Sequence, residues 1–277
     1  MTLSQRNTFF KFGIILTTLS ALVVIAISDN VIPAYPDMAL QAINRPDGYA
    51  QFLTGHFLKT NFYAVHTALV AGILYSCIST ILIMYYFEKT QAPEIIYIAV
   101  FVVSFSLEIT RLLIPLQYLH SISPFYLLLA SRILLFGRFF SIFSLCTAGV
   151  CAAGLDVQKT LTIMAVIAVA TLTIAIGVSI DTQTWDTSLN PIRGYTSLFR
   201  LIEGAAFITT VISFFIAAHS KGQREYNFIG LGSLLVLCGR SLLLFSDTWI
   251  SPSVGILILS FGTWLMCAYL HKIYLWR

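Results

Sequence analysis

Residues 95–116, IIYIAVFVVSFSLEITRLLIPL, indicate how this chain folds. A helix that crosses a membrane needs about 20 consecutive, predominantly apolar residues. This segment supplies them with only two charged side chains, Glu108 and Arg111. Similar stretches recur along the chain and predict an all-α, polytopic transmembrane helix bundle of about eight spanning helices. The expected spans are residues 10–30, 62–86, 95–116, 125–154, 161–180, 196–218, 227–246 and 252–275.

The composition supports this prediction and excludes several functions. Apolar residues make up 58% of the chain and charged residues 10%, whereas soluble domains carry about 25% charged residues. No basic tract occurs, so we expect no nucleic-acid partner. The five cysteines are scattered, and His56, His66 and His120 lack close ligand spacing, so we expect no metal and no cofactor. Residues 1–277 are therefore predicted to form a single integral membrane domain in a lipid bilayer.

The first apolar run, residues 13–27, has two interpretations. It follows Arg6 and Lys11, as the apolar part of a secretory signal does. Residues 24–26, VIA, make a poor cleavage site, so we interpret the run as the first spanning helix.

Basic residues orient the bundle. With a cytoplasmic N-terminus, eight basic residues fall in cytoplasmic segments and three in outer segments. This bias follows the positive-inside rule and predicts that both termini are cytoplasmic, in a plasma (inner) membrane. The cytoplasmic set is Arg6, Lys11, Lys89, Lys159, Lys221, Arg224, Lys272 and Arg277, and the outer set is Arg45, Lys59 and Arg193.

Two outer loops are long enough to carry structure of their own. Residues 31–61 contain apolar side chains at helical spacing, which suits a short amphipathic helix on the outer surface. These are Tyr49, Phe52, Leu53, Phe57 and Leu58. The other loop, residues 181–195, contains Trp185, Asp186, Pro191 and Arg193. Cytoplasmic loops are short, so we expect either that any output passes through a partner membrane or cytoplasmic protein, or that the function is completed within the membrane.

The feature that predicts a site is a set of charged residues within the spans. They lie toward the outer ends of the helices, with Asp247 at the edge. A charged side chain at the centre of a spanning helix costs about 2.5–3.5 kcal/mol on insertion scales, so several at one level indicate a polar chamber. The set comprises Arg111, Arg132, Arg138, Arg200, Arg240, Glu108 and Glu203.

Two spans carry the same pair of charges in opposite order. The third span reads Glu108-x-x-Arg111, and the sixth reads Arg200-x-x-Glu203. Because these spans run in opposite directions, both place the arginine outermost. Residues three apart share a helix face, so each pair can project into a common interior, where we expect both glutamates to pair with arginines.

Glycine directly precedes two of the arginines, at Gly137-Arg138 and Gly239-Arg240. Glycine removes side-chain bulk, which permits either the close approach of another helix or the access of a ligand.

The arginines outnumber the acids at this level. Five arginines and two glutamates leave a net charge of +3, or +2 when Asp247 is included. Arginine does not lose its proton in proteins, so the surplus needs carbonyl groups, water, a lipid headgroup or a bound anion. Two structural roles without a ligand stay open: the guanidinium groups snorkel to the headgroups, or they form salt bridges that only fasten helices together. Because guanidinium geometry suits carboxylate and phosphate, we favour a ligand pocket.

These observations predict an integral membrane receptor or sensor-type protein whose outward-facing, arginine-rich pocket binds an anionic, amphiphilic ligand such as an anionic lipid. The alternatives are a membrane enzyme or transporter acting on an anionic, lipid-like substrate, and a structural subunit of a membrane complex. An enzyme needs an acid or base from Glu108, Glu203 or His120, and since no nucleophile motif occurs we name no catalytic residue. In helix count and orientation the layout resembles the multi-helix membrane input modules of bacterial sensors.

Overall fold

The computed structural model describes residues 3–36, 38, 61–90, 92–154 and 160–275. Each predicted span corresponds to a helical segment, and eight helical segments in these ranges are long and apolar enough to cross a membrane. The predicted helical bundle is therefore confirmed. Its helices are α1 (Leu3–Val31), η1 (Ile32–Ala34), α3 (Phe62–Phe87), α4 (Glu94–Ser104), η4 (Phe105–Leu112), α5 (Leu113–His120), α6 (Pro124–Ala153), α7 (Thr160–Gly177), α8 (Thr196–Lys221), α9 (Glu225–Leu244) and α10 (Ile250–Leu275). The predicted spans 161–180 and 227–246 extend too far, because α7 ends at Gly177 and α9 ends at Leu244.

The third span differs from the unbroken α-helix that its sequence predicts. Its middle forms the 3-10 helix η4, which is eight residues long, although such runs rarely exceed about four residues. The hydroxyl groups of Ser106 and Thr110 donate to backbone carbonyls three residues earlier, at 2.7 and 2.8 Å. Bonds of this kind compete with the helix ladder and bend helices. Residues three apart eclipse in a 3-10 helix, so Glu108 and Arg111 share one face.

Glycines bring the helices around the charged layer into close contact. A Cβ added at Gly137 of α6 would meet Leu107 Cδ1 at 2.9 Å, so η4 can lie against α6 because position 137 is small. A Cβ at Gly239 of α9 would come within 2.6 Å of the backbone nitrogen of Leu259 in α10. Both glycine–arginine pairs therefore serve the close approach of a neighbouring helix.

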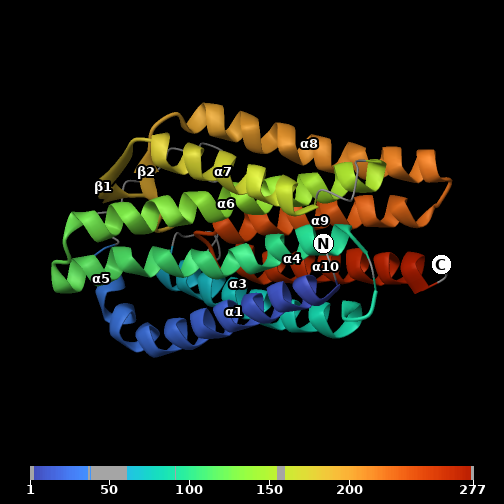
Figure 1. The fold of residues 1–277 in the computed structure, drawn as a ribbon. Coiled ribbons are helices and arrows are strands. Elements are labelled where there is room, and N and C mark those ends of the chain that lie inside the picture. The colour runs from blue at the N-terminus through green and yellow to red at the C-terminus, as the bar shows by residue number, and fades with distance from the viewer. Residues whose placement is uncertain (1–2, 37, 39–60, 91, 155–159, 276–277) are drawn as a thin grey trace.

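The loop between α7 and α8 folds into a β-hairpin at one end of the bundle. Strand β1 (Ile180–Trp185) pairs antiparallel with β2 (Pro191–Arg193). Figure 1 places the hairpin near the start of α6 and at the end of the bundle opposite the C-terminus. The sequence pattern predicted only an outer loop over residues 181–195. Because α6 packs against both α4 and α8, the hairpin lies over the end of a central helix.

A buried arginine fastens α1 to the end of α3. Arg6 Nη2 donates to the carbonyls of Phe87 and Glu88, at 2.7 and 2.9 Å, and Nη1 donates to the carbonyl of Thr90. The last carbonyls of a helix have no partner within it, so Arg6 caps α3. The charge count had given Arg6 only the role of a cytoplasmic positive charge.

Large apolar side chains cover the outside of the bundle. Leu257 is 70% exposed, Leu161 67% and Ile15 66%, which is the kind of surface that lipid contact requires. The amphipathic helix expected within residues 31–61 falls mainly on positions 39–60, which lie outside the described residues.

Candidate functional site

Glu108 is the centre of the charged layer and is buried in η4. Arg138 of α6 donates two hydrogen bonds to it, from Nε to Oε1 and from Nη2 to Oε2, both at 2.8 Å. Arg111 Nη1 donates to Oε2 at 3.4 Å. The predicted pair of Glu108 and Arg111 is therefore confirmed. The shorter bonds come from Arg138, which sequence spacing had not identified as a partner.

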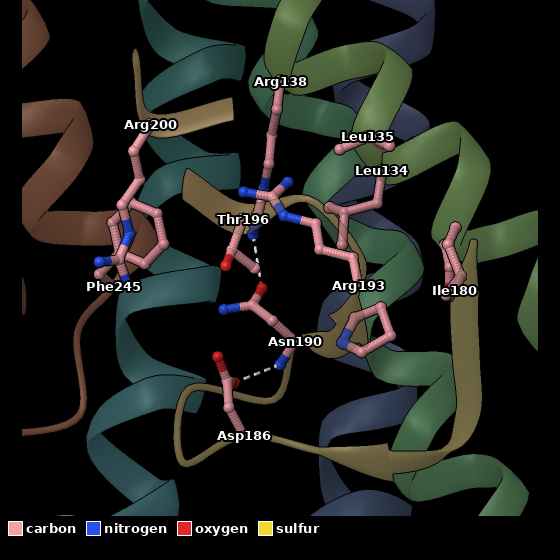
Figure 2. A pocket seen from close by; sticks show the side chains of 12 residues that line it. Leu134, Leu135, Arg138, Ile180, Asp186, Asn190, Arg193, Thr196, Arg200 and Phe245 are labelled. Carbon is pink, nitrogen blue, oxygen red and sulfur yellow. Dashed lines mark hydrogen bonds between the residues drawn. The ribbon is translucent and has the colours of Figure 1, made fainter. Parts of the chain in front are cut away.

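The turn of the β-hairpin supplies two further acceptors. Arg138 Nη2 donates to Asn190 Oδ1 at 2.7 Å, and Arg111 Nη2 donates to the carbonyl of Ser188. Figure 2 shows the Asn190 side chain reaching from the turn to the Arg138 guanidinium. Neither Asn190 nor Ser188 was predicted, because no pattern within a loop shows that its turn packs against buried arginines.

Asp186 holds this turn in shape. Its Oδ1 accepts the backbone N–H groups of Ser188 and Asn190, at 3.0 and 2.8 Å, as aspartate side chains often do in turns. Leu189 between them has a left-handed φ of 52°, uncommon for leucine, and its side chain is fully buried. An aspartate followed two and four residues later by serine and asparagine was the available sequence signal for this turn.

Arg240 of α9 joins the cluster from another helix. It is buried, and its Nη2 donates to the backbone carbonyl of Arg138 at 2.9 Å. The same carbonyl also accepts from the Ser141 hydroxyl at 2.8 Å. The carbonyls of Ser188 and Arg138 therefore take up part of the positive surplus that the charge count predicted.

The other predicted site residues lie apart from Glu108. Arg200 is exposed and Glu203 half-buried on α8, and in the part of the chain that the structure describes no ion pair within 4 Å joins them. The expected second pair is thus not observed. Arg132 Nε is buried without a hydrogen-bond partner, and this residue lines none of the described cavities that border Glu108, Arg138 or Arg200.

A cavity of about 10 Å³ lies against Glu108, Arg138 and Arg240, and two further cavities share Arg200. The smaller of these two, of about 40 Å³, lies between the hairpin, α6 and α8. Figure 2 shows Arg138, Arg193 and Arg200 around it, with Asp186 below. The larger, of about 400 Å³, lies between α8 and α9 against α6. The larger cavity is lined by Ile142, Arg200, Glu203, Gly204, Phe207, Ile208, Leu237, Arg240 and Ser241.

The histidines within the described part of the chain have other surroundings than a metal site. His66 lies between the Tyr35 hydroxyl, 2.7 Å from Nδ1, and the Ser28 hydroxyl, 3.0 Å from Nε2. Burial raises the pKa of the Tyr35 hydroxyl. His120 is exposed at the end of α5, and His56 lies outside the described residues. Among the described residues, no group of three or more histidine, cysteine, aspartate or glutamate side chains is placed to hold a metal ion.

Comparison with models of protein families, with curated proteins and with solved structures found no match for this chain.

Proposed function

We propose that this chain is an integral membrane protein of the receptor or sensor type, which binds an anionic amphiphile near the outer ends of its helices. The apolar exterior of the bundle supports insertion into a plasma (inner) membrane. The distribution of basic residues supports cytoplasmic N- and C-termini. A partner membrane or cytoplasmic protein carries the output onward.

The larger cavity carries this proposal. Arg200 and Arg240 contribute two guanidinium groups to it, and Phe207, Ile208 and Leu237 contribute apolar side chains. Ligand pockets measure about 300–1,000 Å³ and combine a mostly apolar lining with a few polar groups that orient the ligand. A cavity with a cationic part and an apolar part suits a molecule with an anionic head and an apolar tail.

We assign two roles within the charged layer. One group holds the helices and the hairpin together through its hydrogen bonds; it consists of Glu108, Arg111 and Arg138. The other group lines the cavity and meets the ligand; it consists of Arg200, Glu203 and Arg240. Arg240 also belongs to the fastening, because it donates to the Arg138 carbonyl. Nothing in the structure explains Arg132.

An enzyme acting on the same ligand has less support. Of the acid–base candidates, Glu108 already accepts bonds from two arginines, and His120 lies exposed at the end of α5. Glu203 lines the cavity. The hydroxyl beside it, that of Ser241, donates to the backbone carbonyl of Leu237 at 3.0 Å, so the described lining pairs no nucleophile with a base.

Native mass spectrometry of the full-length protein, released gently from detergent micelles, tests the proposal. Arg200→Gln removes the exposed arginine of the cavity, and Arg132→Gln is the matched control. We expect wild type and Arg132→Gln to retain a defined anionic species. Arg200→Gln should retain about tenfold less, because a charge-assisted hydrogen bond contributes about 1.5 kcal/mol or more. Equal retention in all three, or none in any, would refute the anion site and favour the structural-subunit alternative.

A further inference from the structure

The larger cavity also indicates which class of anion it accepts, an inference that rests on the proposed function. On α8 its lining follows one helix face, because Arg200, Gly204 and Ile208 recur every four residues. All three are exposed. The cavity is therefore open along the side of the bundle, between α8 and α9, where a ligand can enter from the surrounding lipid.

The cationic part of the cavity lies at its outer end. Arg200 is near the start of α8, and Ile208, eight residues further along, lies about 12 Å deeper at 1.5 Å per residue. Helix α9 runs in the opposite direction, as Figure 1 shows, so Leu237 lies deeper than Arg240. Guanidinium groups outside and apolar side chains inside match the orientation of a lipid in the outer leaflet.

The volume of the cavity suits a single chain. The space measures about 400 Å³. Ligand pockets measure about 300–1,000 Å³, so this cavity lies near the lower end of the range and suits a ligand with one apolar chain.

The charges of the lining suit a head with one negative charge. Arg200 and Arg240 contribute +2 and Glu203 contributes −1, which leaves +1. A carboxylate carries a single negative charge and pairs well with guanidinium. A phosphate monoester carries about −1.5 to −2 at pH 7, and its second charge is repelled by Glu203.

We propose that this cavity binds a single-chain carboxylate amphiphile, a fatty acid of medium chain length, which enters laterally from the outer leaflet. Its carboxylate meets Arg200 and Arg240, and its chain lies along Phe207 and Ile208. Glu203 is the residue that discriminates against dianionic heads.

A cavity-filling variant tests the location. A Cβ added at Gly204 meets no atom within 4 Å, so Gly204→Leu occupies the cavity without displacing its walls, and it removes a glycine from a helix interior. Ala205→Leu, at the next position, is exposed and outside the lining, which makes it the matched control. Equilibrium binding of radiolabelled laurate to full-length protein in an uncharged detergent is the measurement. We expect wild type and Ala205→Leu to bind laurate with the same affinity. Gly204→Leu should bind laurate at least about tenfold more weakly, and its unfolding temperature should not fall.

A second variant tests the ligand class. Glu203→Gln should raise the affinity for dodecyl phosphate relative to laurate by about tenfold, because it removes a like charge from the site. Full laurate binding by Gly204→Leu would overturn the location. Tighter binding of dodecyl phosphate or of dioleoyl phosphatidylglycerol than of laurate to wild type would overturn the ligand class. In either case, an anion whose retention depends on Arg200 would still support the proposed function. If no anion is retained through Arg200, the proposed function and the fatty-acid assignment are both refuted.

Discussion

Replacing Glu108 with glutamine removes the negative charge between two buried guanidinium groups while keeping the size of the side chain. The carboxylate accepts two bonds of 2.8 Å from Arg138 and one of 3.4 Å from Arg111. Glutamine presents an NH₂ group where one carboxylate oxygen stood, so at least one bond to Arg138 becomes a contact between two donors. A hydrogen bond to a charged group contributes about 1.5–3 kcal/mol, and removing one partner of a buried ion pair costs about 3–5 kcal/mol.

We therefore expect Glu108→Gln to lower the free energy of unfolding by about 4 kcal/mol. The assay is unfolding of the full-length protein in mixed micelles with increasing sodium dodecyl sulfate, followed by tryptophan fluorescence. Glu203→Gln makes the same chemical change at a half-buried carboxylate without an ion pair among the described residues, and we expect less than about 1 kcal/mol there. If the two variants unfold at the same detergent fraction, the reasoning that Glu108 holds the arginines is refuted.

Three further changes test other contacts. Asn190→Ala removes a hydrogen-bond acceptor of Arg138. The backbone amides of the hairpin turn should therefore exchange about tenfold faster in hydrogen–deuterium exchange. Unchanged exchange would mean that this bond does not hold the turn. Gly239→Leu brings a Cβ within 2.6 Å of the Leu259 nitrogen and should cost about 3 kcal/mol in the same unfolding assay; a neutral result would contradict the close contact of α9 and α10. Arg6→Met keeps an apolar side chain but removes the hydrogen-bond donors to the end of α3. It should lower the free energy of unfolding by about 2 kcal/mol and speed amide exchange at that end of α3. Faster exchange in the hairpin alone would contradict the role of Arg6 as a cap.

Most of the fold was predictable from hydropathy. In a bilayer each backbone polar group must be bonded within its own helix, so apolar runs correspond directly to helices. The 3-10 segment was not predictable, because hydropathy does not register how Ser106 and Thr110 bond to the backbone. The hairpin strands were missed because their residues are polar and few.

The site was predictable only in part. Spacing revealed the pair of Glu108 and Arg111, since three residues bring side chains together in both α- and 3-10 helices. The same spacing suggested a pair of Arg200 and Glu203, which the structure does not form. Arg200 instead lines a cavity together with Asp186. The count of charges located the layer, but only tertiary packing decides which arginines meet a carboxylate, a carbonyl or a cavity.

The order in which the buried charges are synthesised has a consequence for assembly. Glu108 and Arg138 lie in consecutive spans, so a chain inserted during translation brings this pair together as soon as α6 enters the membrane. Arg111 also needs the carbonyl of Ser188, which is translated 77 residues later. Until then its guanidinium is left with the longer contact to Glu108. The hydrogen bonds of Arg111 are thus complete only after the hairpin between α7 and α8 has been synthesised.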